Sequence, residues 1–231
     1  MRLIDRYTYR NFVKAMVCKV YDTMEYSFHH PFSTLKRKSH LSTVQFIEEN
    51  CPRAVACRSP KKLLTLALRS LNKPGLILEF GVFRGDSLRY MAKKMPQREL
   101  HGFDCFEGLP EAWVSNPKGA FDMGGQLPKV PSNVQLWKGY FEDTLPEWAQ
   151  THSQPIAMIH VDCDLNSSTE TIFKVLADRV EPGTVLLFDD YFNFPGWEQD
   201  GHAVFTQFAD RFGWEIDYIG YAYKELALVV V

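Results

Sequence analysis

Four apolar segments of this chain end on acidic residues. The acids are Glu79, Asp104, Asp162 and the pair Asp189-Asp190. If the segments are buried parallel strands, their carboxylates gather at one edge of the sheet, where open α/β folds bind their ligands. Carboxylates that converge in this way need hydroxyl donors or a cation as partners. The pattern therefore predicts a cofactor that carries a ribose, with a metal ion near it.

The first acid begins a turn with two glycines, Glu79-Phe80-Gly81-Val82-Phe83-Arg84-Gly85-Asp86-Ser87, between a predicted strand and a helix. Glycine lets the backbone approach a ligand closely, and the free N–H groups at a helix start can bind an anion. The spacing differs from the Gly-x-Gly-x-x-Gly of dinucleotide-binding turns. Taken alone, the turn could also serve only to pack the strand against the helix.

Asp104 ends the next predicted strand, where an acid can accept both hydroxyl groups of a ribose. The alternative for Asp104 is a cap or turn residue that bonds only to the backbone.

Asp162 and Asp189-Asp190 follow two strands that we expect to be neighbours, which brings three carboxylates close together. Unpaired, such charges cost on the order of several kcal/mol at an effective dielectric constant of about 20, or raise the pKa of one carboxyl. A hard divalent cation such as Mg²⁺ removes the conflict, because it binds carboxylate oxygens and keeps positions for substrate. The alternatives are that Asp164 caps the following helix and that Asp190 is a solvated turn residue. His160, just before this cluster, is interpreted as a core histidine.

The segments that position these acids alternate between strand and helix from residue 60 onward. Strands are expected at Leu76–Phe80, Leu100–Phe103, Val134–Trp137, Ile156–Val161, Thr184–Phe188, Trp214–Ile219 and Ala227–Val231. Helices are expected near Pro60–Leu71, Asp86–Lys94, Leu145–Gln150, Ser167–Val180 and His202–Phe212. This alternation predicts an α/β fold: a Rossmann-like, seven-stranded, mostly parallel sheet with helices on both faces and a closing antiparallel hairpin.

Two segments fall outside this alternation. Residues 1–60 have helical periodicity with breaks at His29-His30-Pro31 and Cys51-Pro52, which predicts a helical N-terminal extension before a catalytic domain over 61–231. The apolar face of this extension could form a lid or a homodimer surface, or simply pack on the domain. Gly108–Asn133 is too long for an ordinary connection and predicts a lid, with a surface insertion as the alternative.

Composition excludes several classes of protein. A net charge of −2, from 26 basic and 28 acidic residues, gives no indication of a nucleic-acid partner. Five cysteines without a Cys-x-x-Cys pair indicate neither a disulfide framework nor a zinc site, so we expect a reducing, cytoplasmic location. We find no signal peptide and no apolar run near the roughly 20 residues of a membrane span.

Five motifs then occur in order. They are Leu78-Glu79-Phe80-Gly81-Val82-Phe83-Arg84-Gly85-Asp86-Ser87, Gly102-Phe103-Asp104-Cys105-Phe106-Glu107-Gly108-Leu109-Pro110, Gly139-Tyr140-Phe141-Glu142-Asp143-Thr144-Leu145-Pro146, His160-Val161-Asp162-Cys163-Asp164-Leu165 and Phe188-Asp189-Asp190-Tyr191. With these motifs the chain, from about residue 75 to 210, resembles the macrocin O-methyltransferase family of class I S-adenosylmethionine-dependent methyltransferases.

The resemblance implies a role for each part of the edge. It implies that the methionine portion of the cofactor is surrounded by Gly81, Phe83, Gly85 and Ser87. Asp104 would bind the ribose, with Glu79 at the same nucleoside end, and Tyr140 or Phe141 would lie by the adenine. Asp162, Asp189 and Asp190 would hold Mg²⁺, and Asp164 would be the general base. Asn166 follows the Asp-x-Asp-Leu motif where the family commonly has tyrosine or a similar residue, so contacts to the acceptor are expected to differ.

The sequence hypothesis is therefore a Mg²⁺-dependent O-methyltransferase that acts on a hydroxyl of a small molecule, with a sugar of a natural product or glycan as the leading acceptor. One alternative is an NAD(P)-dependent oxidoreductase on a similar sheet. Another is a non-catalytic protein that binds the cofactor.

Overall fold

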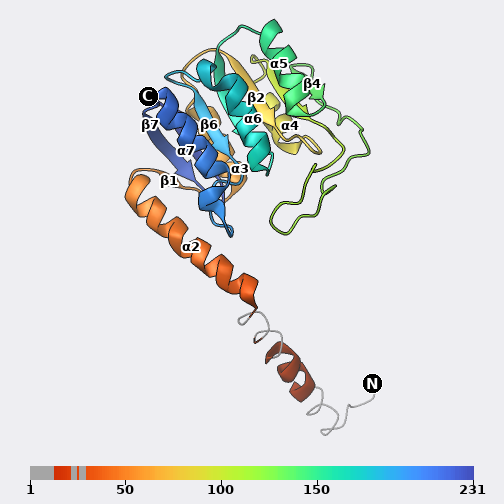
Figure 1. Cartoon of the computed structure of the whole chain (residues 1–231), viewed down its shortest axis with the longest axis vertical. Helices are drawn as coiled ribbons and strands as arrows, with labels where there is room; N and C mark the ends of the chain where they lie inside the picture. Colours follow the sequence, from red (N-terminus) through yellow and green to blue (C-terminus); the bar gives the residue numbers. More distant parts are fainter. Residues whose placement is uncertain (1–12, 22–24, 26–29) are drawn as a thin grey trace, which may run out of the picture.

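The computed structural model describes residues 13–21, 25 and 30–231. Its centre is an eight-stranded sheet in the order β1-β7-β8-β6-β5-β2-β3-β4 (Figure 1). The strands are β1 (Val55–Ala56), β2 (Leu76–Phe80), β3 (Leu100–Asp104), β4 (Val134–Lys138), β5 (Ile156–Val161), β6 (Val185–Phe188), β7 (Ile216–Tyr221) and β8 (Leu226–Val230). All neighbours pair in parallel except β8, which is antiparallel to both β6 and β7. The predicted fold, with its closing hairpin, is confirmed.

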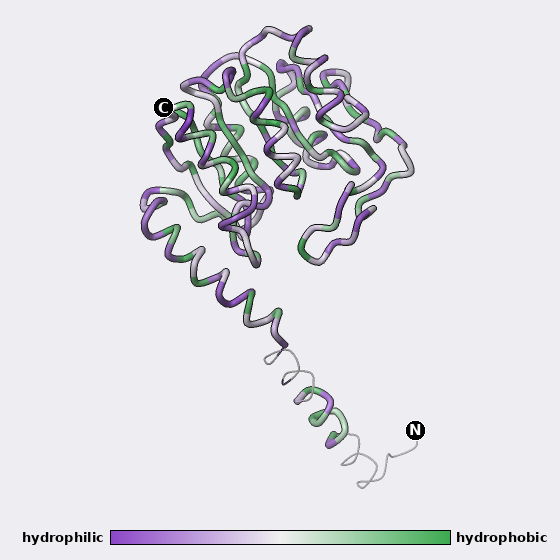
Figure 2. Tube along the Cα trace, in the orientation of Figure 1, coloured by the Kyte–Doolittle hydropathy of each residue, from purple (hydrophilic) through white to green (hydrophobic). Residues whose placement is uncertain are grey.

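The helices are α2 (Pro31–Asn50), α3 (Pro60–Arg69), α4 (Asp86–Lys94), α5 (Phe141–Thr151), α6 (Asn166–Leu176) and α7 (Gly201–Phe212), with short 3₁₀ turns η1 (Ala177–Arg179) and η2 (Trp197–Gln199). Two separate apolar clusters show that helices cover both faces of the sheet. One cluster contains residues of α3 and α4, such as Leu63 and Met91. The other contains residues of α5, α6 and α7, such as Trp148, Phe173 and Phe205. Figure 2 shows apolar stretches running through the centre of the domain.

The eighth strand, β1, was not predicted. It pairs in parallel with β7 through Val55 opposite Gly220 and Ala56 opposite Tyr221. Two residues are too few to show the alternation by which a strand is recognised. The sheet therefore begins inside the segment that the sequence assigns to the N-terminal extension.

Helix α2 begins and ends at the breaks expected from the sequence. Pro31 is its first residue, the His30 Nδ1 accepts a hydrogen bond from the Phe32 N–H at 3.2 Å, and Cys51 follows its end. Phe46, near the end of α2, packs against the rings of Tyr191 and Trp197, with ring centroids 5.8 and 5.7 Å away. The start of α2 extends away from the sheet (Figure 1). Among the described residues, no helix is both long enough and apolar enough to cross a membrane.

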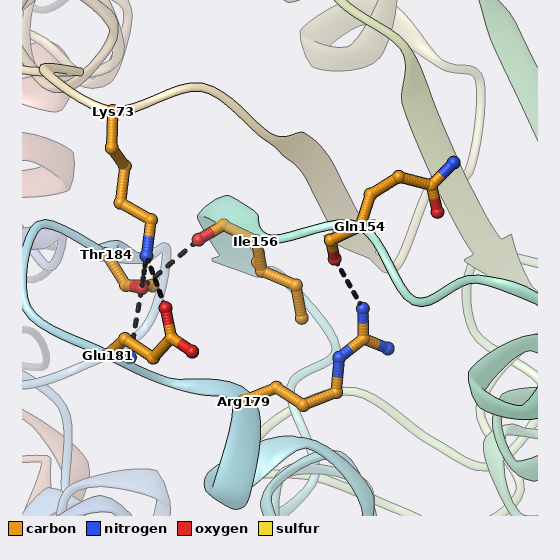
Figure 3. A network of polar contacts seen from close by, with 6 residues as sticks. All are labelled: Lys73, Gln154, Ile156, Arg179, Glu181 and Thr184. Carbon is orange, nitrogen blue, oxygen red and sulfur yellow. Dashed lines mark hydrogen bonds and ion pairs between the residues drawn. The ribbon is translucent and has the colours of Figure 1, made fainter.

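Polar contacts tie together the edge of the sheet at which β5 and β6 begin (Figure 3). The Lys73 Nζ donates to Thr184 Oγ1 at 3.2 Å, and this hydroxyl donates to the Ile156 carbonyl at 3.1 Å. The Arg179 Nη2 donates to the Gln154 carbonyl at 2.7 Å. The strand-end acids lie at the opposite edge, at the carboxyl ends of the parallel strands.

Candidate active site

A cavity of about 630 Å³ opens at the edge where β2, β3, β5 and β6 end. Its wall also includes the start of α6 and part of the long loop after β3. Most of the predicted site residues line it: Gly81, Phe83, Asp104, Tyr140, Phe141, Asp162, Asp164, Asp189 and Asp190. The acids that follow β3, β5 and β6 therefore converge at one edge of the sheet, as predicted.

The turn after β2 adopts backbone conformations that are unfavourable for residues with a side chain. Gly81 has φ +93°, and a Cβ there would lie 1.7 Å from the Asp162 carbonyl oxygen. Phe83 also has a positive φ of 47°, an uncommon conformation for a residue with a side chain. Gly81 is thus required by the close approach of the turn to the end of β5, as well as by any ligand in the cavity.

Asp104 holds this turn in place. Its Oδ2 accepts hydrogen bonds from the backbone N–H groups of Val82 at 2.8 Å and Phe83 at 2.7 Å. Its Oδ1 accepts one from the Phe106 N–H at 2.7 Å. An ionised carboxylate has about four lone-pair positions, so three backbone bonds leave room for a ligand hydroxyl. Asp104 therefore fits both a structural role and the predicted ribose contact.

Replacing Asp104 by asparagine is expected to weaken binding of S-adenosylhomocysteine by about 10- to 100-fold. The amide NH₂ would face backbone N–H groups, because both oxygens of Asp104 accept hydrogen bonds from them. Calorimetric titration measures the effect, and Asp143→Asn, at an exposed position in the first turn of α5, is the matched control. Equal affinity of the Asp104 and Asp143 variants would contradict a role for Asp104 in the cofactor site.

The aromatic pair after β4 differs in exposure. Tyr140 is 40% exposed and lines the cavity wall, whereas Phe141 is buried with its ring 5.3 Å from that of Phe80. Both touch the cavity, but Tyr140 has the more accessible ring for stacking on a base.

Ser87 lines a second cavity of about 470 Å³, beside α3 and α4. Asp162 and Asp189 line both cavities, so the two share a wall of carboxylates. Gly85 lines neither cavity; it precedes α4 with φ +73° and lies against Arg89 and Pro128.

Glu79 also lines neither cavity, because its side chain is fully buried. Its Oε1 lies 2.8 Å from the His160 Nδ1, and its Oε2 has no hydrogen-bond partner among the described residues. Burial by itself would lower the pKa of His160, but the carboxylates of Glu79, Asp189 and Glu225 raise it overall. The buried position predicted for His160 is confirmed, and the structure adds an ion pair that the sequence did not indicate.

The carboxylates beyond this pair raise one another's pKa. Burial, followed by the charges of Asp189 and Glu79, raises the pKa of Asp162 well above its usual range. Burial, followed by the charge of Asp190 and a hydrogen bond to it, raises the pKa of Asp164 to about 7. The pKa of Asp189 is raised by burial. A carboxyl with a pKa near neutrality suits general acid–base catalysis.

Lys224 is a residue of this site that was not predicted from the sequence. Lys224 lies between β7 and β8, lines the main cavity, and places its Nζ 2.5 Å from Asp190 Oδ1. Its Nζ also lies 5.6 Å from the centroid of the Trp113 ring. Burial alone would lower the pKa of Lys224, but Asp190 raises it overall, so the ammonium stays charged. A single lysine in a hairpin turn gives no signal in the sequence, because only the sheet order brings it to Asp190.

The predicted metal ligands Asp162, Asp189 and Asp190 all line the main cavity, but they do not bring one oxygen each within 4.8 Å of one another. Among the described residues, two groups of three bring one ligand atom each within 4.8 Å of one another, and neither is Asp162, Asp189 and Asp190. One of the two groups is Glu79, His160 and Asp162. The donor chemistry nevertheless fits a hard divalent cation, because the wall of the cavity offers several carboxylate oxygens.

The other group, Glu99, His101 and His152, lies away from this edge. The Trp137 Nε1 donates to the His101 Nδ1 at 3.1 Å, so the proton of a neutral His101 ring is on Nε2. Its Nε2, 3.2 Å from Glu99 Oε1, then carries the ring proton and offers no lone pair to a metal.

Residues of the long loop between β3 and β4 contact the start of α6 and the segment before α7, beside the main cavity. The Ser167 Oγ donates to Glu111 Oε1 at 3.0 Å, and the Trp113 Nε1 donates to Asp200 Oδ2 at 2.9 Å. The Trp113 ring also packs against Phe194, with centroids 5.4 Å apart. These contacts agree with a lid, which stays a prediction.

Comparisons with known proteins point to one kind of domain. Residues 78–191 match the family model of a methyltransferase domain. A curated relative, the 8-demethyl-8-(2,3-dimethoxy-alpha-L-rhamnosyl)-tetracenomycin-C 4'-O-methyltransferase of Streptomyces olivaceus, is 29% identical over 142 residues. That alignment covers 51% of this chain and 53% of that protein, so the chain spans about half the length of this curated relative.

Solved structures share the fold. The calicheamicin methyltransferase CalS11 matches with a TM-score of 0.59 and 20% identity, over 87% of this chain and 93% of that chain. The O-methyltransferase TomG from Streptomyces achromogenes, solved in complex with SAM, matches with a TM-score of 0.52 and 19% identity, over 92% and 96%. At these identities the likeness concerns the fold. Together with the domain match, the findings support a class I methyltransferase, while the macrocin family stays a prediction.

Proposed function

We propose that this chain, whose residues 78–191 match a methyltransferase domain, is an S-adenosylmethionine-dependent O-methyltransferase that acts on a hydroxyl group of a small molecule. The observation that carries the proposal is the main cavity. It joins the turn at Gly81 and the Asp104 carboxylate, which suit the cofactor, to Asp164 and its neighbours, which suit a hydroxyl acceptor.

We assign the acceptor to the sugars of natural products or glycans. The name of the curated relative describes a methyl transfer to the 4'-oxygen of a rhamnosyl group, and its aligned region includes half of this chain. The hydroxyl and carboxylate groups in the cavity wall, from Ser167 and Ser168 to Asp164, suit a polyhydroxylated acceptor.

The cofactor assignments follow the two cavities. Asp104 and Tyr140 take the nucleoside portion in the main cavity, and Gly81 and Phe83, in the wall of the same cavity, lie by the methionine portion. Ser87, at the start of α4, takes the amino-acid portion in the second cavity, close to Asp162. Glu79 is buried and does not contact the cofactor directly. It pairs with His160, which lines the second cavity.

The methyl transfer is an in-line displacement. The acceptor oxygen forms a bond to the methyl carbon while the carbon–sulfur bond of the sulfonium breaks, and S-adenosylhomocysteine leaves. Asp164 takes the proton of the acceptor hydroxyl, since it lines the cavity and its pKa of about 7 lets it act as a base at neutral pH. The product ether and the protonated Asp164 balance the reaction.

We also propose that Asp162, Asp189 and Asp190 hold Mg²⁺ or another divalent cation. The balance of charge supports this. The site holds five carboxylates, those of the three proposed ligands, Asp164 and Glu79, and among the described residues the basic groups paired with them are Lys224 and His160. A divalent cation held there would supply Lewis acidity that eases loss of the acceptor proton. The protein's own part is to hold the carboxylates in position from the ends of β5 and β6.

Incubation with methyl-labelled S-adenosylmethionine and a panel of glycosides tests the proposal. We expect label in an acceptor, loss of transfer with a chelator, and loss of transfer in Asp162→Ala. Transfer that is indifferent to both the chelator and Asp162→Ala would reject the metal role and leave the methyltransferase. Thermal stabilisation by NAD and not by S-adenosylhomocysteine would favour the oxidoreductase instead.

A cytoplasmic location and a homodimer also remain proposals. All five cysteines lie in the described part of the chain and are free thiols, which supports a reducing compartment. The exposed apolar side chains of α2, Leu35, Leu41 and Val44, support a partner on that helix. Sedimentation of the full chain and of a variant with Leu35→Glu and Leu41→Glu measures whether this face of α2 is needed for a dimer.

A further inference from the structure

Lys224 is unusual among the groups around the main cavity. Of the described residues that line it, Lys224 alone carries a basic side chain. The acidic residues of the same wall are Asp104, Glu142, Asp162, Asp164, Asp189 and Asp190. The position of this one ammonium therefore decides how the negative charge of the site is distributed.

Both the backbone and the side chain of Lys224 have partners in the structure. Its carbonyl oxygen accepts a hydrogen bond from the Tyr191 N–H at 3.0 Å, and its own N–H donates to Glu225 Oε2 at 3.0 Å. Its side chain is 33% exposed and ends 2.5 Å from Asp190 Oδ1, under the Trp113 ring. The backbone bonds place Lys224 next to Asp190, and the ammonium itself is held by the ion pair with that carboxylate and by the Trp113 ring.

Asp190 is also one of the three carboxylates assigned to the cation. An oxygen that accepts a charged hydrogen bond from Lys224 is less available to a metal, and two cations a few ångströms apart repel each other. The same carboxylate therefore has two possible partners, one supplied by the chain and one from solution.

We propose that Lys224 is an internal counter-ion of the carboxylate cluster, and that a divalent cation competes with its ammonium for Asp190. The inference rests on the metal site of the proposed function. Lys224 lowers the affinity of the site for the cation and keeps the cluster balanced without it. Because the same ammonium lies under the Trp113 ring, a cation that displaces it would also remove its contact with the loop that carries Trp113.

Calorimetric titration of Mn²⁺ into chelator-treated, dialysed protein tests the competition. Lys224→Met keeps the aliphatic stem and removes the charge, so we expect Mn²⁺ to bind at least about tenfold more tightly, equivalent to about 1.4 kcal/mol. Lys224→Arg keeps the charge and should stay near the wild-type affinity. Damage to the fold would weaken binding, so tighter binding separates competition from a merely structural role.

Controls separate the possible failures. Lys174→Met removes an exposed ammonium that pairs with Glu170 on α6, and should leave Mn²⁺ affinity unchanged. Lys224→Gln serves as a second neutral variant if Lys224→Met does not fold. Equal or weaker Mn²⁺ binding by the neutral variants overturns the competition alone. Absence of Mn²⁺ binding in every variant, with methyl transfer that survives a chelator, overturns the metal site and the competition but not the methyltransferase.

Discussion

Replacing Asp164 by asparagine is expected to lower kcat by about 10²- to 10⁴-fold while the protein stays folded. Asp164 lines the main cavity beside Asp162 and has the pKa, about 7, that a base needs at neutral pH. Asparagine has nearly the same shape but cannot take the acceptor proton. It also tolerates the positive φ of 61° at this position better than most residues.

The pH dependence of kcat gives a second measurement for the same residue. Only the carboxylate form of Asp164 accepts a proton, so kcat should fall as the pH drops through the pKa of Asp164 and level off above it. This pKa is about 7 without a cation and is lower with a cation on Asp162, Asp189 and Asp190, because the cation offsets the charges that raise it. The asparagine variant should lack this acidic limb. Asp210→Asn, at an exposed position on α7, is the matched control. Full activity of Asp164→Asn with an unchanged pH profile would remove the assignment of the base.

Gly81→Ala is expected to destabilise the protein by about 3 to 5 kcal/mol and to abolish cofactor binding. The new Cβ would lie 1.7 Å from the carbonyl oxygen of Asp162, and backbone atoms of a sheet cannot easily move aside. The Gly81 N–H also donates to the Phe103 carbonyl at 2.9 Å, so a shift of the turn would break a bond to β3. Denaturant unfolding measures the stability, and titration with S-adenosylhomocysteine measures the binding.

Gly196→Ala separates the clash from the backbone strain. Gly196 has a similar φ of +88°, but a Cβ there would meet nothing within 4 Å. Its substitution should cost only the strain of the left-handed conformation, about 1 to 2 kcal/mol. If both variants lose the same stability, strain alone explains Gly81 and the close approach to Asp162 contributes little.

The Gly81 contact also explains how the two halves of the site stay in register. The Asp162 N–H donates to the Phe80 carbonyl at 2.8 Å, and the Asp162 carbonyl lies against Gly81. The turn assigned to the cofactor and the carboxylate cluster assigned to the acceptor are therefore joined through backbone. A methyl donor and a hydroxyl acceptor that bind at these two places would be aligned by the sheet itself, which is the main requirement of a displacement reaction.

The acids at the strand ends could be found from the sequence because a buried strand has a local signature. An apolar run such as Ile156–Val161, followed at once by Asp162, marks both the strand and its carboxyl end. Since parallel strands place these ends at one edge, the place of the main cavity and the strand-end acids Asp104, Asp162, Asp189 and Asp190 in its wall follow from order and spacing. The same local periodicity determined the seven longer strands and the limits of α2.

Contacts between distant segments decided the rest. Glu79 looks from sequence like the other strand-end acids, yet its side chain is buried against His160, because β2 and β5 are neighbours with these residues opposite each other. Lys224 reaches Asp190 only because β8 lies next to β6 in the sheet. Strand pairing and burial depend on residues far apart along the chain. The sequence by itself therefore determined which acids reach the edge. Only the tertiary structure decided which of them face the cavity and which basic side chain, His160 or Lys224, pairs with them.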